Sequence, residues 1–386
     1  MRPSDYELVE PRFRRALCVI DALGAATWGL RGLFAPRRRI DPDEIRRILV
    51  LGTYGLGDAI LATGCWRALR DRFPNAIIDA MSSPRSDVLV RMLPYFDSVT
   101  IFDNPVYRVR ESKPGNWAAA RSAIRALRAR RYDLCLDVIG DLPNCALAAA
   151  TGARIRIAHP TMGGGFFLTH PVARDTANTH QRAILAETLA PLGIDARAHS
   201  MELPVSEADL AEAHHVIAER IDGPWAAISP GALTSAKTWP AERFAALAAR
   251  LKERFGWSSI LLGAPSEKDL GTRIADASHG AAVSLCGELA LGTVFGAIAQ
   301  ARVFVGNDSG LTHAAVALDV PAVQLFGPGL PDRFGHRDAR REILFDNDCR
   351  FHPCSTFRCK VPDAWCMERL HVDAAADAVA RVTGAA

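Results

Sequence analysis

The stretch Val305–Leu318 constrains the fold of this chain most, because a short apolar run passes through a glycine turn directly into a helix. In an open α/β sheet, ligands bind at such junctions, at the carboxyl edge of a strand. Gly310 lets a ligand approach the backbone closely, and the first N–H groups of the helix can face a phosphate. We therefore expect an anionic ligand to contact Asp308, Ser309, Gly310, Leu311, Thr312 and His313.

A second junction of this kind spans Ser229–Pro240. Pro240 fixes the start of a helix, so that Thr234, Ser235 and Lys237 project from a loop at the carboxyl edge of a strand. Two hydroxyls and one ammonium group suit a diphosphate. The alternative is that Lys237 is an ordinary surface lysine.

A third strand-to-helix crossover, Gly263–Glu267, follows about thirty residues later. Glu267 could hold ribose hydroxyls, or it could only start its helix favourably against the helix dipole.

Strands and helices alternate along both halves of the 386-residue chain, which is long enough for two domains. This βαβ alternation predicts an α/β protein with two Rossmann-like, doubly wound parallel sheets. The predicted strands are 48–51, 76–80, 134–138, 154–157, 226–229, 259–262, 283–285, 303–305 and 322–326. The predicted helices are 58–72, 118–131, 241–255, 267–277, 291–301 and 311–318.

Composition excludes several classes of protein. A net charge of +3 is too small to indicate a nucleic-acid partner. No window approaches the roughly 20 apolar residues of a transmembrane helix. Nine cysteines, most of them scattered singly, do not form the framework of a secreted disulfide-rich domain. We therefore expect a cytoplasmic protein.

The first half carries its own glycine turn, Gly52–Asp58, which is neither a dinucleotide-binding fingerprint nor a P-loop. Gly55 and Gly57 would bring the loop backbone close to a ligand, and Asp58 would stand at the start of the next helix, facing that ligand. The alternative is that Asp58 only caps the helix, a common role for aspartate.

The N-terminal arm, residues 1–45, is basic and amphipathic. Seven arginines (residues 12, 14, 15, 31, 37, 38 and 39) surround an apolar stretch that contains one acid, Asp21. One hypothesis is an interfacial helix on an anionic membrane, with Trp28 and Phe34 inserted and the arginines on the headgroups. The other is an amphipathic helix packed on the protein itself.

Taken together, three motifs resemble those of glycosyltransferase family 9, the bacterial lipopolysaccharide heptosyltransferases. Their cores are Gly55-Leu-Gly-Asp58 with Arg67-Ala-Leu-Arg70, then Lys237-Thr-Trp-Pro240, then Asp308-Ser-Gly-Leu-Thr-His313. The resemblance runs from about Ile48 to Val372. One departure is Ala62-Thr63-Gly64, where the family often has Thr-Pro.

The resemblance implies a GT-B fold, with an acceptor domain (46–205) and a nucleotide-sugar domain (206–348) facing a cleft. It implies an inverting, metal-independent transfer of a heptose or related sugar from an ADP-sugar to a lipid-linked glycan acceptor, with no cofactor required for catalysis. Asp58 matches the family's catalytic base, while Lys237 and the Asp308–His313 turn match the residues around the donor diphosphate. Glu267 falls at the donor ribose, and the adenine would lie near Glu288–Leu291, against Leu289. The arm would then keep the enzyme on the inner face of the cytoplasmic membrane.

The segment 349–386 combines a cysteine cluster with a closing helix. Cys349, Cys354, Cys359 and Cys366 lie within 18 residues and could hold a structural zinc or iron ion. Their spacing lacks the paired C-x-x-C form, so reduced buried thiols or a pair of disulfides are the alternative.

Two other functions stay open at the level of sequence. One is a heptosyltransferase that acts on a protein of the autotransporter type, and the other is a non-catalytic sugar-binding relative. The presence of Asp58, Lys237 and Asp308 argues against loss of activity.

Overall fold

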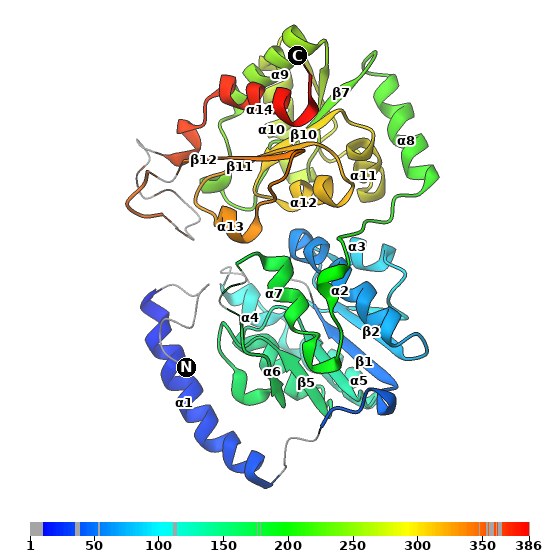
Figure 1. The fold of residues 1–386 in the computed structure, drawn as a ribbon, viewed down its shortest axis with the longest axis vertical. Helices are drawn as coiled ribbons and strands as arrows, with labels where there is room; N and C mark the ends of the chain where they lie inside the picture. The colour runs from blue at the N-terminus through cyan, green and yellow to red at the C-terminus, as the bar shows by residue number, and fades with distance from the viewer. Residues whose placement is uncertain are drawn as a thin grey trace. The chain divides into compact units, whose positions relative to one another are not determined.

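The computed structural model describes residues 11–34, 39–52, 55–110, 114–175, 177, 179–346, 348–352, 354, 359, 361 and 365–385. Within these ranges the side chains of residues 11–14, 27–34 and 108–110 are not described, so the predicted membrane anchors Trp28 and Phe34 lie outside what the structure shows. The chain divides into two compact units, Met1–Met201 and Glu202–Ala386 (Figure 1).

The described part of the first unit contains a six-stranded sheet in the order β3-β2-β1-β4-β5-β6, in which every pair of neighbours is parallel. Its central strands are buried along nearly their whole length, as expected for a parallel sheet covered on both faces. The chain reverses its winding direction between β1 and β4, where Leu51 pairs with Asp137. The strands are β1 (Arg47–Leu51), β2 (Ile77–Ser82), β3 (Ser98–Ile101), β4 (Leu134–Asp137), β5 (Ile155–Ala158) and β6 (His170–Pro171).

The helices of the first unit connect these strands and carry recognisable start signals. Asn116 and Asp141 cap α5 and α6 through their side chains. Helix α2 runs unbroken through Ala62-Thr63-Gly64, where the motif departs from the family. A Cβ on Gly64 would lie 2.7 Å from the carbonyl oxygens of His199 and Ser200, so glycine permits close packing there. The helices are α2 (Leu56–Arg72), α3 (Asp87–Met92), α4 (Pro105–Arg110), α5 (Trp117–Ala129), α6 (Leu142–Ala150) and α7 (Gln181–Glu187).

The second unit repeats the architecture, with the described strands in the order β12-β11-β10-β7-β8-β9, again all parallel. Its strands are β7 (Trp225–Ser229), β8 (Ser258–Leu261), β9 (Ala282–Ser284), β10 (Val303–Asn307), β11 (Ala322–Phe326) and β12 (Arg341–Phe345). Its helices are α8 (Glu207–Ala218), α9 (Ala241–Phe255), α10 (Lys268–Ala277), α11 (Leu291–Ala299), α12 (Gly310–Ala317), α13 (Pro331–Phe334) and α14 (Val372–Thr383). The closing helix α14 contributes Ala375, Ala378 and Val379 to the core of this unit.

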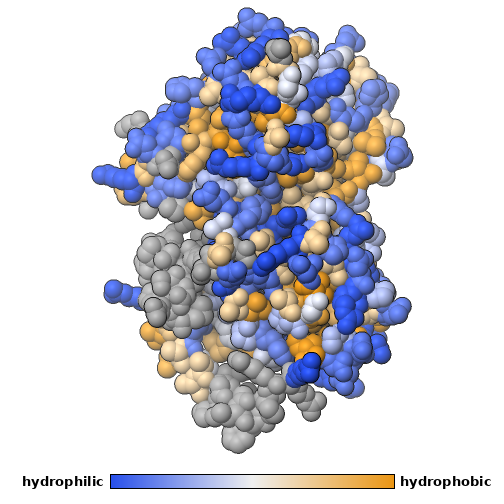
Figure 2. Space-filling model, viewed as in Figure 1, coloured by the Kyte–Doolittle hydropathy of each residue, from blue (hydrophilic) through white to orange (hydrophobic). Residues whose placement is uncertain are grey.

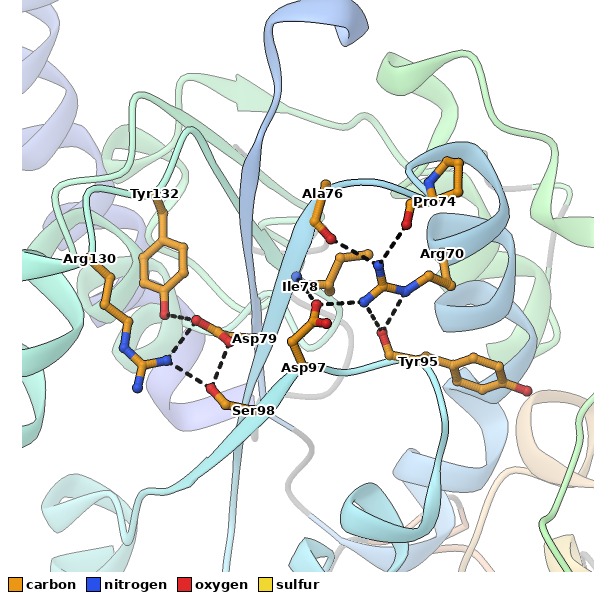
Figure 3. Close-up of polar contacts among 10 residues, drawn as sticks. All are labelled: Arg70, Pro74, Ala76, Ile78, Asp79, Tyr95, Asp97, Ser98, Arg130 and Tyr132. Atoms are coloured by element: carbon orange, nitrogen blue, oxygen red, sulfur yellow. Dashed lines mark hydrogen bonds and ion pairs between the residues drawn. The ribbon is translucent and has the colours of Figure 1, made fainter.

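Two arginine-centred networks fix the amino ends of strands β2 and β3 (Figure 3). Arg70 donates hydrogen bonds to the carbonyls of Tyr95 and Ala76 and to the carboxylate of Asp97. Burial alone would raise the pKa of Asp97, but hydrogen bonds from the Ile78 N–H and Arg70 lower it. The Arg70 of the first motif therefore has a structural role, at the sheet edge opposite the carboxyl ends.

In the second network of Figure 3, Asp79 on β2 is 2% exposed and accepts hydrogen bonds from three side chains. Its partners are Ser98 at 2.6 Å, Arg130 at 2.7 Å and Tyr132 at 2.7 Å. A buried carboxylate with these partners stabilises the fold, because both of its oxygens accept hydrogen bonds.

In helix α1 (Pro11–Phe34), the side chains that the structure describes are those of residues 15–26, and one side of this stretch packs against the rest of the first unit. Asp21 accepts a 2.8 Å hydrogen bond from the Gly164 N–H, and a Cβ on Gly24 would lie 2.4 Å from the ring of Phe166. The other side is apolar and exposed, with Val19 at 59%, Ile20 at 43% and Leu23 at 64%. Figure 2 shows this apolar surface at the lower left of the view, where α1 lies in Figure 1. No described helix is long and apolar enough to cross a membrane.

Candidate functional site

The two junctions predicted in the second half lie side by side. Strand β7 is the neighbour of β10, and Ser229 pairs with Gly306 near the carboxyl ends of both strands. This is the point where the strand order reverses, the usual ligand site of a doubly wound sheet. The loop with Thr234, Ser235 and Lys237 and the turn Asp308–His313 therefore meet at one edge of the sheet.

Asn307 connects the two junctions, and the sequence prediction missed it. Its side-chain amide, which is fully buried, donates to the carbonyl of Pro230 at 2.8 Å and accepts from the Trp239 N–H at 3.1 Å. The Thr312 hydroxyl donates to the Asn307 carbonyl at 2.5 Å. One residue thus positions the loop after β7, the approach to α9 and the first turn of α12. Its position directly before Asp308, next to the predicted ligand turn, is the sequence feature that could have indicated this role.

Lys237 and Asp308 form an ion pair, with the Lys237 Nζ 2.6 Å from the Asp308 Oδ2. The Asp308 side chain is 7% exposed and that of Lys237 is 32% exposed. The Lys237 ammonium is thus aimed at the sheet edge by a buried carboxylate. This geometry does not fit an ordinary surface lysine, and the Lys237 side chain stays partly exposed at this edge.

Two hydroxyls at this edge have no hydrogen-bond partner within the described part of the chain. They are the Thr234 Oγ1 and the Ser309 Oγ, both shielded from solvent. A buried hydroxyl without a partner costs about 1–3 kcal/mol, so such groups mark places where a ligand completes the hydrogen bonding. Both belong to the residues predicted to contact a diphosphate.

Helix α12 starts within the same turn. Ser309 is its N-cap, with extended backbone and no side-chain capping bond, so the first N–H groups of Gly310, Leu311 and Thr312 begin the helix. These groups and the helix dipole favour an anion at this end.

Glu267 lies against two glycines at the neighbouring edge of β7 and β8. A Cβ on Gly231 would lie 1.7 Å from the Glu267 Oε1, and a Cβ on Gly263 would lie 2.4 Å from its Oε2. The carboxylate also accepts a 2.7 Å hydrogen bond from the Ala264 N–H, so Glu267 does organise the start of its own helix. Burial raises the pKa of Glu267, an effect that the Ala264 N–H opposes. Leu289, predicted near the adenine, lies half-buried in the turn after β9.

In the first unit, Asp58 lies at the corresponding edge, after β1. The alternative in which Asp58 only caps this helix is wrong in position, because α2 begins at Leu56 and Gly55 is its N-cap. Asp58 lies inside the first turn, and its Oδ2 would be 3.4 Å from a Cβ on Gly55, so the carboxylate folds back over the helix start. Gly57 belongs to the same turn.

An acidic cluster at the end of β4 was not predicted from the sequence. Asp137 is fully buried and accepts hydrogen bonds from the N–H groups of Ile139 and Gly140, at 2.9 and 3.1 Å. Burial raises its pKa to about 7. Asp141 accepts a 2.7 Å hydrogen bond from the Tyr107 hydroxyl. Because β4 adjoins β1, these carboxylates lie beside the strand that leads to Asp58.

The four C-terminal cysteines face one small apolar cavity, which Trp365 and Pro328 also line. None of the four is joined to another cysteine by a disulfide, so the alternative of a pair of disulfides is wrong. Burial raises the pKa of Cys366 to about 11, and the three neighbouring thiols add to the rise. Among the residues that the structure describes, no group of three or more His, Cys, Asp or Glu side chains lies close enough to hold a metal ion.

Comparison with known proteins identifies relatives along most of the chain. The family model described as glycosyltransferase family 9 (heptosyltransferase) matches residues 120–362. Lipopolysaccharide heptosyltransferase 2 of Escherichia coli K12 is 28% identical over 311 residues, covering 74% of this chain and 84% of the relative. Lipopolysaccharide heptosyltransferase 1 of Pseudomonas aeruginosa is 29% identical over 255 residues, covering 64% and 67%. The structure of the E. coli ADP-heptose lps heptosyltransferase II superposes with a TM-score of 0.68 at 21% identity, covering 87% of this chain and 98% of that one, and has the same fold.

Proposed function

This chain belongs to glycosyltransferase family 9, the heptosyltransferases, and we propose that it moves a heptose from an ADP-sugar to a lipopolysaccharide core or related glycan. The observation that carries the proposal is the sheet edge where the Lys237–Asp308 pair meets the unsatisfied hydroxyls of Thr234 and Ser309. The curated relatives act on lipopolysaccharide, and this supports a glycan acceptor over a protein acceptor.

On the donor side, the diphosphate would accept hydrogen bonds from the Thr234 and Ser309 hydroxyls. The Lys237 ammonium and the first N–H groups of α12 would supply positive charge. Departure of ADP increases the negative charge on the diphosphate, and preorganised donors at this point lower the barrier because they need no rearrangement. Glu267 would hold the ribose hydroxyls, and Leu289 would lie against the adenine.

On the acceptor side, we assign Asp58 as the general base. The acceptor hydroxyl gives its proton to the Asp58 carboxylate while its oxygen attacks the anomeric carbon. The bond from that carbon to the ADP oxygen breaks on the opposite face, so the configuration inverts. No step uses a metal ion or a cofactor.

Incubation of the purified chain with a panel of nucleotide sugars tests this proposal. We expect ADP-heptose to raise the melting temperature and to be consumed when a heptose-free core glycan is added, with the product identified by mass spectrometry. Stabilisation by UDP- or GDP-sugars but not by ADP-sugars would contradict the donor assignment, and transfer only to a protein would contradict the acceptor assignment.

We also propose that helix α1 holds the protein on an anionic membrane surface. Asp21 and Gly24 attach one side of the helix to the first unit, and the other side exposes Val19, Ile20 and Leu23. An exposed apolar stripe in a segment with seven arginines matches the chemistry of a membrane interface, where apolar side chains insert and arginines contact headgroups.

Vesicle flotation tests the membrane proposal. Replacement of Val19, Ile20 and Leu23 together by serine should abolish binding to phosphatidylglycerol vesicles. Serine at Val88, which is 52% exposed on α3 of the same unit, is the matched control and should bind as the unmodified chain does. Equal binding by the triple variant and the control would refute a role for α1.

A structural zinc or iron ion at Cys349, Cys354, Cys359 and Cys366 is a further proposal. The four thiols face one cavity, and four thiolates are a usual ligand set for either metal. They would have to move closer together to bind an ion.

A further inference from the structure

Two imidazole rings pair beside the start of α12. The Nδ1 of His313 and the Nε2 of His336 are 3.1 Å apart, and the rings lie edge to face, with an interplanar angle of 78°. His313 is 5% exposed, so this contact is largely shielded from water. At 3.1 Å the two nitrogens share one hydrogen bond.

The backbone of His336 is held from inside the sheet. Gln324 on β11 is fully buried, and its side-chain amide bonds to both backbone polar groups of His336. The Gln324 Nε2 donates to the His336 carbonyl at 2.5 Å, and the His336 N–H donates to the Gln324 Oε1 at 3.0 Å. Because both polar atoms of the buried Gln324 amide bond to the His336 backbone, they hold this residue in place and so position the His336 ring.

The shared hydrogen bond decides where His313 carries its other proton. One nitrogen of the contact must donate and the other must accept. If the His336 Nε2–H donates, then the Nδ1 of a neutral His313 is an acceptor, and its proton lies on Nε2. If the His313 Nδ1–H donates instead, its Nε2 is a bare lone pair, which repels phosphate oxygens. Only the first arrangement gives an anion a hydrogen-bond donor on a neutral ring.

We infer that His336 is a positioning residue, which donates to the Nδ1 of His313 and so keeps that ring in the Nε2–H form. The consequence for the donor diphosphate rests on the proposed function. The protonation pattern itself is a property of the ligand-free protein, so the two parts can be tested separately.

The first test is NMR of the ligand-free, full-length chain labelled with ¹⁵N-histidine, at neutral pH. The His313 signals are identified by their loss in His313→Gln. We expect the pattern of an Nε2–H ring in the unmodified chain and a mixture of the two neutral forms in His336→Phe. An Nδ1–H ring or a doubly protonated ring at His313 in the unmodified chain would overturn the inference, as would an unchanged pattern in His336→Phe.

The second test is calorimetric titration with ADP. His336→Phe should weaken ADP binding about three- to tenfold, the effect of one misdirected hydrogen bond. His336→Gln can still donate from its amide and should recover most of the affinity. His215→Phe, on an exposed ring of the same unit, is the control for the substitution itself. Unchanged ADP affinity in a folded His336→Phe refutes the ligand role, whereas failure of the unmodified chain to bind ADP refutes the proposed function and leaves the NMR result decisive.

Discussion

Removal of the Lys237 ammonium should have two separable effects, because its partner is a buried carboxylate. In Lys237→Ala the diphosphate loses one charge-assisted contact, which is worth about 1.5–3 kcal/mol. That range corresponds to an ADP dissociation constant about ten- to a hundredfold larger. The Asp308 side chain, 7% exposed, would also lose its 2.6 Å partner. A buried charge left without a partner lowers the free energy of unfolding by about 3–5 kcal/mol, and the part of Lys237 that is exposed places the effect at the lower end.

The double variant Lys237→Ala with Asp308→Asn separates the two effects. It removes the unpaired carboxylate, so the free energy of unfolding in urea should recover while calorimetric ADP affinity stays weak. Lys252→Ala is the matched control, because Lys252 lies in the same unit and its side chain donates to the Ser258 hydroxyl, away from the candidate site. The reasoning fails if Lys237→Ala binds ADP as tightly as the Lys252→Ala control, or if the double variant is no more stable than the single one.

Four further substitutions or measurements probe other parts of the site. Asp58→Asn should leave ADP affinity and melting temperature unchanged while turnover falls by about 10²–10⁴-fold, and full turnover would exclude Asp58 as the base. Ser309→Ala removes a hydroxyl that has no partner in the described chain, so it should raise the free energy of unfolding of the ligand-free protein and weaken ADP binding; a loss of stability would contradict this. Because burial raises the pKa of Asp137 to about 7, the unfolded chain loses this proton first as pH rises. Stability should therefore fall between about pH 4 and 7, by up to about 1.4 kcal/mol per unit, and urea unfolding should show a weaker fall in Asp137→Asn. Elemental analysis of the untreated protein decides the metal proposal, which less than about a tenth of an atom per chain would end.

The sequence predicted the central strands well, because those strands are buried on both faces and read as short apolar runs. It missed three strands, all of which lie at the edges of their sheets. Strand β3 (Ser98–Ile101) has no buried residue, β6 (His170–Pro171) is two residues long, and β12 (Arg341–Phe345) begins with two charged residues. Edge strands carry weaker hydrophobic patterns because one side meets solvent, so periodicity does not reveal them.

The sequence predicted the residues of the candidate site that lie in turns between a strand and a helix. It did not predict the residues whose role depends on contacts with distant parts of the chain. Asp308, Lys237 and Thr234 lie in such turns, and their meeting at one edge follows from the strand order. Asn307 lies two residues beyond the predicted strand 303–305, and nothing in the local sequence shows that its amide reaches Pro230 and Trp239. The pairing of His313 with His336 is a tertiary contact between residues far apart in the chain, and a single sequence does not reveal such a contact.

Because the Asn307 amide bonds to both the loop after β7 and the residue leading into α9, the two binding segments are energetically coupled. The effects of substitutions in Ser229–Pro240 and in Val305–Leu318 on ADP affinity will not be additive. The reason is that the buried Asn307 side chain of the second segment holds the first segment in place. A change of donor specificity introduced in one segment will therefore depend on the residues present in the other. Libraries that vary both segments together should contain functional combinations whose single substitutions are inactive.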